Sequence, residues 1–283
     1  MLLWHRYDSM SISASAFAID LDRQTVEVSD ERLAKLRRFN IGMGVLHLIS
    51  GVLMVVLGND FKLDISTFAL DGPPGTPLSE GSINQVWGLP LAWFTASFLF
   101  LSALFHFLIA SPMAFGAYGS ELRRNRNRFR WVEYSISSTL MIVLISLVTG
   151  ITDLAALICI AFVNISMILF GWLMEMSNHF DKGTWWTPFW FGCVAGIGPW
   201  IAIATYIIVN VSRDGGEGPP GFVYGIIFTI FFFFNTFAIN QWLQYRKAGR
   251  WADYLHGETT YIVLSLVAKS ALAWQIFANT LIE

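Results

Sequence analysis

The sequence predicts an all-α membrane protein, folded as a bundle of seven transmembrane helices. The chain is 55% hydrophobic with a mean hydropathy of +0.54, and only 13% of its residues are charged. Soluble domains usually carry about 25% charged residues. Seven stretches also reach the roughly 20 apolar residues that a helix needs to cross a bilayer. Both observations indicate that lipid is the main solvent of this chain.

The predicted spans follow a polar segment, residues 1–38, which we interpret as a cytoplasmic tail with a short amphipathic helix near residues 30–38. Residues 39–283 then form the membrane domain. The connections between spans are short except for the first, residues 59–88. The predicted spans are residues 39–58, 89–111, 130–149, 153–176, 188–211, 221–245 and 258–282.

The long first connection contains a strong turn signal. Residues 71–77 read Asp-Gly-Pro-Pro-Gly-Thr-Pro, and such clusters of glycine and proline mark turns and loops. The preceding residues 61–70 are partly compatible with a β-strand. The connection is therefore compatible with a small β-hairpin and equally with an irregular loop.

Lysine and arginine residues are distributed unevenly between the two sides of the predicted bundle. Fifteen of the 18 lie in the tail or in the second, fourth and sixth connections, whereas only Lys62 and Arg213 lie on the opposite side. Basic residues near span ends favour the cytoplasmic side. We therefore expect a multi-pass protein of the cell membrane, with a cytoplasmic N-terminus, an extracellular C-terminus and residues 59–88 outside.

Lys269 is the exception among the basic residues, because it lies inside the seventh span. It is about 12 residues from the span's start, which corresponds to a depth of roughly 18 Å in a helix. A charged lysine at this depth costs several kcal/mol unless it is paired or chemically modified. Two interpretations follow: an ion pair inside the bundle, or a lysine held for Schiff-base chemistry.

Glu133 is the best candidate for the anion that a protonated Schiff base requires. It lies roughly 12 Å from the cytoplasmic end of the third span by the same helical rise. Ser137 follows Glu133 by four residues, so the two share a helix face. Ser265 precedes Lys269 by four residues and shares that face in the same way. Either hydroxyl can bond near the Schiff base or to the carbonyl group one turn earlier.

Two histidines lie at a depth similar to that of Glu133. His47 is in the first span and His106 in the second, at comparable distances from the cytoplasm. A single histidine in a membrane span is usually a packing residue, but three ionisable groups at one depth predict a polar cavity. Arg130, three residues before Glu133, would close the mouth of this cavity.

The other acidic residues of the spans lie near span ends. Asp153 is at the outer end of the fourth span, and Glu175 and Glu258 are near cytoplasmic ends. We expect hydrated side chains at these positions, which leaves Glu133 as the single candidate counterion.

Several predicted helices also carry residue patterns that match one known family. Residues 129–137 read FRWVEYSIS and residues 265–271 read SLVAKSA. Residues 234–238, residues 243–245 and Asn164 belong to the same pattern. From about residue 38 to its C-terminus the chain resembles heliorhodopsins, which are rhodopsin-like seven-helix retinal proteins with an inverted topology.

The resemblance implies a light-sensing photoreceptor with all-trans retinal bound to Lys269 as a Schiff base and Glu133 as its single counterion. His47 and His106 would lie in a cavity beside Glu133. It also implies isomerisation to 13-cis retinal, a slow signalling or regulatory photocycle without ion pumping, and an unknown cytoplasmic partner. A homodimer is implied as well, with the long extracellular loop in the interface.

Retinal requires a long apolar slot with aromatic walls. At the depth of Lys269 the other spans present several candidate lining residues, and two aromatic residues are further candidates. Aromatic side chains in membrane proteins mostly serve packing or the membrane interface. The candidates are Ser137, Asn164, Met167, Phe234, Tyr134 and Trp190.

The residue pattern also argues against proton pumping. Outward proton pumps carry an acid in the third helix, then a threonine four residues later and a second acid seven residues beyond it. The corresponding residues here are Glu133, Ser137 and Leu144, and Ser265 replaces the aspartate that precedes the pump lysine by four residues. A chain without these carboxylates has no evident proton donor.

Other functional classes remain as alternatives. The chain is compatible with a light-gated ion channel or transporter, and with a seven-helix transporter without retinal, in which Lys269 binds a substrate anion. His47 and His106 with Glu133 are a minor alternative as a metal site. We expect no enzyme, because the HExxH motif and acidic clusters are absent. The net charge of −2 gives no indication of nucleic-acid binding.

Overall fold

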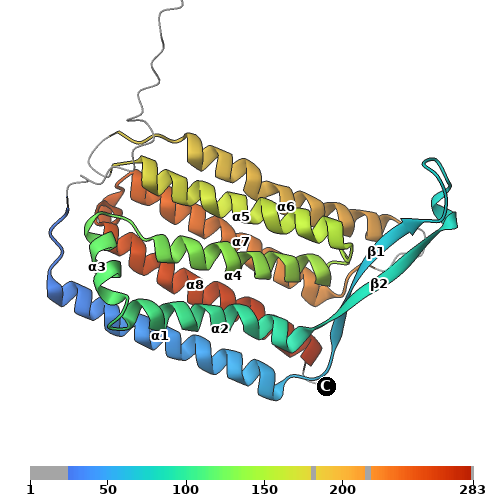
Figure 1. Cartoon of the computed structure of the whole chain (residues 1–283), viewed down its shortest axis with the longest axis horizontal. Helices are drawn as coiled ribbons and strands as arrows, with labels where there is room; N and C mark the ends of the chain where they lie inside the picture. The colour runs from blue at the N-terminus through green and yellow to red at the C-terminus, as the bar shows by residue number, and fades with distance from the viewer. Residues whose placement is uncertain (1–24, 180–182, 214–217, 282–283) are drawn as a thin grey trace, which may run out of the picture.

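Seven long helices lie side by side in the computed structural model, which describes residues 25–179, 183–213 and 218–281 (Figure 1). Most of the predicted tail therefore lies outside the described residues. Within them, seven helices are long and apolar enough to cross a membrane, which confirms the predicted fold class. These helices are α1 (Asp30–Leu57), α2 (Leu91–Ala110), α4 (Arg128–Val148), α5 (Leu154–Ser177), α6 (Thr187–Ser212), α7 (Gly221–Tyr245) and α8 (Tyr254–Ile276).

The first helix begins earlier than the predicted span. Ser29 caps α1 by accepting a hydrogen bond from the backbone amide of Arg32, and Asp30 and Glu31 occupy the first turn. Acidic residues there interact favourably with the helix dipole. The amphipathic helix expected near residues 30–38 is thus the first part of α1, because no proline or turn signal separates it from the apolar run.

The long first connection folds as a β-hairpin, which confirms the hairpin alternative. Strand β1 (Lys62–Leu70) pairs in antiparallel fashion with β2 (Gly81–Pro90), and a bulge falls between Ile65 and Ser66. The Ser66 backbone amide donates to the carbonyl of Thr152 at 2.9 Å, and the two hydroxyl oxygens are also 2.9 Å apart. These bonds attach the hairpin to the connection between α4 and α5.

A short helix that the sequence analysis did not predict lies in the second connection. Helix α3 (Phe115–Arg123) buries Tyr118 and Leu122. Both pack in an apolar cluster with Leu33 of α1 and Leu255 of α8. The segment has only nine residues, so its few apolar side chains do not stand out in the sequence, and their burial depends on the two neighbouring helices.

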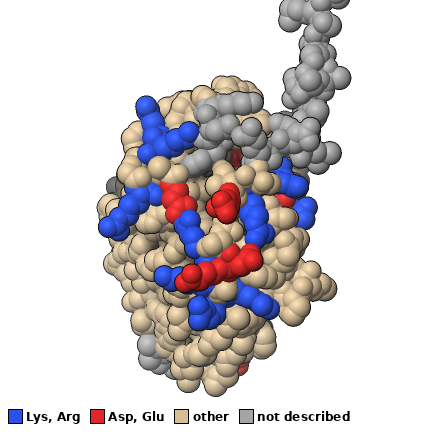
Figure 2. Space-filling model, turned by 90° about the vertical axis from the view of Figure 1, so that its left-hand side faces the viewer, with Lys and Arg blue, Asp and Glu red and all other residues tan. Residues whose placement is uncertain are grey.

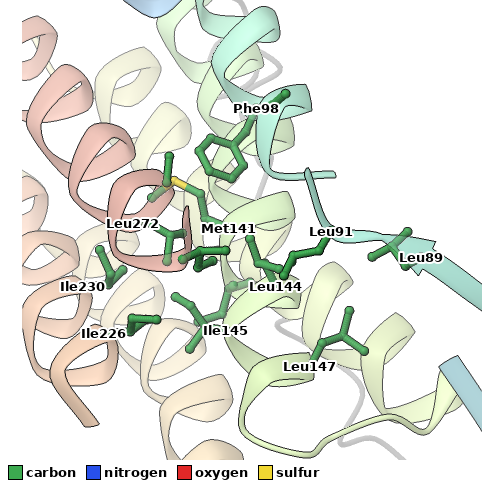
Figure 3. Close-up of a cluster of buried hydrophobic side chains, with 14 of the residues drawn as sticks. Leu89, Leu91, Phe98, Met141, Leu144, Ile145, Leu147, Ile226, Ile230 and Leu272 are labelled. Carbon is green, nitrogen blue, oxygen red and sulfur yellow. The ribbon is translucent and has the colours of Figure 1, made fainter. Parts of the chain in front are cut away.

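The two ends of the bundle differ in what they bury. We call the end where α1 and α8 begin and α3 lies the polar end, and the end that carries β1 and β2 the hairpin end (Figure 1). Apolar side chains fill the half toward the hairpin end (Figure 3). The buried acidic, basic and histidine side chains of the described residues lie between the level of Lys269 and the polar end. They are His47, His106, Glu121, Arg130, Glu133, Glu175, Glu258 and Lys269.

Candidate functional site

An ion pair between α8 and α4 forms the centre of the site. Lys269 and Glu133 are 3% and 5% exposed, and Lys269 Nζ lies 3.0 Å from Glu133 Oε1. The amine also donates to Ser265 Oγ at 2.6 Å, one turn earlier on α8. The ring of Tyr134 lies beside the amine, with its centre 5.2 Å from Nζ. The structure thus brings together the lysine, the carboxylate and one of the two serines proposed from helical spacing.

A serine of α2 donates a hydrogen bond to the carboxylate of Glu133. Ser102 of α2 is buried and donates to Glu133 Oε1 at 2.6 Å. The sequence analysis missed this residue. The signal was available, because Ser102 precedes His106 by four residues and therefore shares its helix face. Glu133 Oε1 accepts hydrogen bonds from both Ser102 and Lys269.

The two predicted histidines lie together near this pair. The rings of His47 and His106 stack with their centres 5.6 Å apart, and His106 Nδ1 is 2.8 Å from Asn40 Oδ1. Neither ring nitrogen of His47 has a hydrogen-bond partner among the described residues. His106 and Glu133 line a small cavity of about 40 Å³, whereas His47 packs behind His106.

Arg130 lines the same small cavity as His106 and Glu133, and it is also the centre of a buried charged cluster. Its Nη2 lies 2.8 Å from Glu175 Oε1, and its Nη1 forms an ion pair with Glu258. Both acids were expected to be hydrated, but they are only 2% and 1% exposed. Trp131 donates to Glu175 at 2.5 Å, and Asn127 donates to Glu258 at 2.5 Å. We call Arg130, Glu175 and Glu258 the Arg130 cluster.

The structure explains why these two acids are buried although they lie near span ends. Tyr254 of α8 donates to Glu175 at 2.7 Å, and Tyr118 of α3 donates to Glu258 at 3.3 Å. Helix α3 and the residues before α4 therefore cover the acids from the polar end. Because a single arginine faces two carboxylates, the surrounding donors are needed to offset the cost of removing these charges from water.

A large apolar cavity of about 430 Å³ adjoins the ion pair. It runs between α4, α5, α6, α7 and α8, and along α6 it extends from Pro188 to Trp200, which is roughly 18 Å of helix. Several glycines form part of the wall; a Cβ atom added at Gly196 would lie 2.6 Å from Met167 Sδ. Of the residues predicted from sequence, the cavity is lined by Lys269, Ser265, Ser137, Tyr134, Met167 and Phe234.

Two predicted lining residues lie elsewhere. Trp190 is 58% exposed, because the cavity-facing positions of α6 include Pro188 and Gly192, and a residue midway between them points to the opposite face. Asn164 is buried, but its amide donates to Ser138 and Thr139 at 2.9 Å each and so joins α5 to α4. Depth along a helix, from which both were chosen, does not fix the direction of a side chain around the helix axis.

A comparison with protein families shows to which family of membrane proteins the chain belongs. The family description "Heliorhodopsin" matches residues 36–281, which is most of the chain. The chain belongs to the heliorhodopsin family. This heliorhodopsin is accordingly a multi-pass membrane protein that binds retinal and senses light, and the family is a non-enzymatic class of rhodopsins. A search among curated proteins found no matching relative.

The cavity of this heliorhodopsin fits a retinal chromophore. Its volume lies within the roughly 300–1,000 Å³ of ordinary ligand pockets, and its walls are mainly apolar and aromatic. Trp200, Phe234 and Phe237 contribute rings, and the amine of Lys269 belongs to the same wall. An elongated apolar slot that contains a buried amine suits a polyene with an aldehyde at one end.

Proposed function

We propose that this heliorhodopsin is a photoreceptor in which all-trans retinal is bound to Lys269 as a Schiff base and Glu133 is the counterion. One observation carries the proposal: a buried lysine and a buried carboxylate lie 3.0 Å apart at the wall of an apolar cavity of about 430 Å³. A purely structural ion pair does not require a long apolar cavity beside it, since protein interiors are otherwise closely packed.

Bound retinal supplies absorption of visible light and isomerisation to the 13-cis form. The protein's own residues hold the positive charge. Glu133 stabilises a proton on Lys269 Nζ, and Ser265 and Ser102 orient the two partners by hydrogen bonds of 2.6 Å each. A proton that leaves Nζ has the Glu133 carboxylate as its nearest basic acceptor, with Oε1 3.0 Å away, and His106 lines the adjoining small cavity.

The packing of the bundle supports a sensor and argues against a pump. Toward the hairpin end, Leu144, Ile145 and Leu272 are fully buried in the apolar core (Figure 3). Among the described residues no buried carboxylate lies between Lys269 and the hairpin end. A proton released from Nζ therefore returns on the side from which it left, and we propose a slow signalling or regulatory photocycle without net transport.

The polar end is proposed to face the cytoplasm. Basic side chains gather there around a few acidic ones (Figure 2), and basic residues near span ends favour the cytoplasmic side. The inverted topology of heliorhodopsins supports the same orientation. The N-terminus is then cytoplasmic, the hairpin and the C-terminus are extracellular, and a cytoplasmic partner reads the signal.

We also propose that the protein forms a homodimer through the hairpin. The hairpin exposes Ile83 and its cross-strand partner Phe68, with exposed fractions of 77% and 45%. Large apolar side chains grouped on an exposed surface often mark a protein interface. A second copy of the hairpin would cover them.

The spectrum of the purified protein tests the proposed function. Addition of all-trans retinal should produce a visible absorption band in the wild-type protein and none in Lys269→Ala. The variant Lys62→Ala, which removes a lysine of the hairpin, should show the wild-type band. A visible band that persists in Lys269→Ala would rule out the attachment site.

A further inference from the structure

A single small cavity touches both Glu133, the partner of Lys269 in what we call the photoactive pair, and two members of the Arg130 cluster. Glu133 and Ser265 line the cavity of about 40 Å³ together with Arg130 and Glu258. Arg130 precedes Glu133 by three residues on α4, so the two side chains are about one helical turn apart. In a medium of low effective dielectric constant, a change of charge at Glu133 acts strongly on Arg130.

Glu258 connects this region to helix α3. Its Oε1 accepts hydrogen bonds from Asn127 at 2.5 Å and from the hydroxyl of Tyr118 at 3.3 Å, while its Oε2 pairs with Arg130. Tyr118 lies on α3 and is 1% exposed. A redistribution of the Arg130 interactions would therefore change the hydrogen bond that Tyr118 of α3 donates to Glu258.

The position of α3 depends on these contacts. A helix of nine residues is too short to be stable in water by itself. Its buried face, formed by Tyr118 and Leu122, packs on α1 and α8. The Tyr118–Glu258 hydrogen bond is one of the few polar contacts that hold α3 on the bundle, so its loss is enough to shift this short element.

The outer side of α3 belongs to the basic face of the polar end. Arg123, Arg124 and Arg128 follow or end the helix, and Arg123 pairs with the exposed Asp30 at 2.9 Å. Figure 2 views this face along the bundle, and we expect such an end face of a membrane-spanning bundle to lie in the aqueous phase. Its charge is complementary to an acidic protein surface.

We propose that the outer surface of α3, with Arg123 and Arg124, binds an acidic, soluble protein partner. The Tyr118–Glu258 hydrogen bond couples this surface to Lys269 and Glu133. The proposal rests on the proposed function. Illumination changes the charge at Lys269 and Glu133, the interactions of Arg130 redistribute, and α3 moves with its arginines. Tyr118 is then a positioning residue that acts through Glu258 and not on the chromophore.

The test uses the full chain with bound retinal and the exposed α3 residue Ser120 replaced by cysteine. A water-soluble maleimide fluorophore labels this position, and the protein without Ser120→Cys serves as the blank for Cys159 and Cys193. We expect a light-dependent change of fluorescence that disappears in Tyr118→Phe, although the visible band and its bleaching by light persist. The matched control is Tyr206→Phe on α6, which should keep the fluorescence change.

A second readout addresses the partner. The affinity of the labelled protein for polyglutamate, used as an acidic probe, should differ by about threefold or more between dark and light, and Tyr118→Phe should abolish the difference.

Glu258→Gln offers the same test if Tyr118→Phe does not fold. A light-dependent signal retained in both variants would overturn the coupling. A signal that requires anionic lipid in nanodiscs would overturn the soluble partner, and the absence of any visible band would instead reject the proposed function.

Discussion

Lys269 Nζ and Glu133 Oε1 lie 3.0 Å apart, although the two residues are 136 positions apart in the sequence. Both side chains are buried, so water cannot screen the attraction between them. The energy of this contact is therefore available to stabilise a positive charge on the lysine nitrogen and to tune the absorption of a chromophore attached to it.

Replacement of Glu133 by glutamine should shift the visible absorption band to longer wavelength. The neutral amide no longer stabilises the positive charge near the nitrogen in the ground state, and the gap to the excited state becomes smaller. Absorption spectra of the two purified pigments measure the shift. Glu121→Gln is the control, because this buried acid pairs with Arg126 and not with Lys269. An unmoved band in Glu133→Gln would reject Glu133 as counterion.

Replacement of Ser102 by alanine should shift the band in the opposite direction and by less. Ser102 donates to the same oxygen of Glu133 that faces Lys269, so its loss leaves more negative charge for the lysine nitrogen. Absorption spectra of the purified pigments measure this shift. Ser146→Ala is a matched control, since Ser146 is equally buried but donates only to Ile142 in its own helix. Equal spectra for Ser102→Ala and wild type would contradict the role of this hydrogen bond.

Replacement of Arg130 by glutamine should strongly destabilise the protein. Glu175 and Glu258 would remain buried without a cation, and removal of one partner from a buried ion pair costs about 3–5 kcal/mol. The temperature at which the visible band is lost in detergent measures stability. Arg128→Gln should have little effect, because Arg128 is exposed and lies over the ring of Phe129. Equal thermal stability of the two variants would show that the cluster is not needed for folding.

Replacement of Gly196 by leucine should impair the binding of retinal. Even the first side-chain carbon would lie 2.6 Å from Met167 Sδ, and the remaining atoms would enter the apolar cavity. The rate and yield of pigment formation after addition of retinal measure the effect. Gly225→Leu makes the same substitution on α7 at a glycine with no atom within 4 Å of an added Cβ. Normal pigment formation in Gly196→Leu would place retinal elsewhere.

The sequence predicts well how deep along its helix each functional residue lies, because helical rise and spacing are regular. Lys269 and Glu133 meet as expected, and Ser265 lies one turn from the lysine on the same face. The turn signal was compatible with the β-hairpin but did not decide between it and an irregular loop. The direction of a side chain around the helix axis is harder to predict, since it depends on which neighbours surround the helix. Trp190 therefore points away from the cavity although its level was plausible.

The burial of the Arg130 cluster could not be predicted from hydropathy. Glu175 and Glu258 are near the ends of their spans, where side chains are normally hydrated. They are buried because α3 and Tyr254 cover them, and α3, with nine residues, is too short to be recognised without its packing partners. The chemistry of these acids thus depends on contacts between segments that are distant in sequence.

The apolar packing toward the hairpin end has an electrical consequence. Because the buried ionisable groups of the described chain lie on one side of that packing, charge displaced by light crosses only part of the membrane's electric field. A full crossing is worth about 2.3 kcal/mol per elementary charge at 100 mV, and a partial path gives the corresponding fraction. A voltage-clamped membrane should therefore record a brief displacement current that reverses in darkness, with no sustained flow.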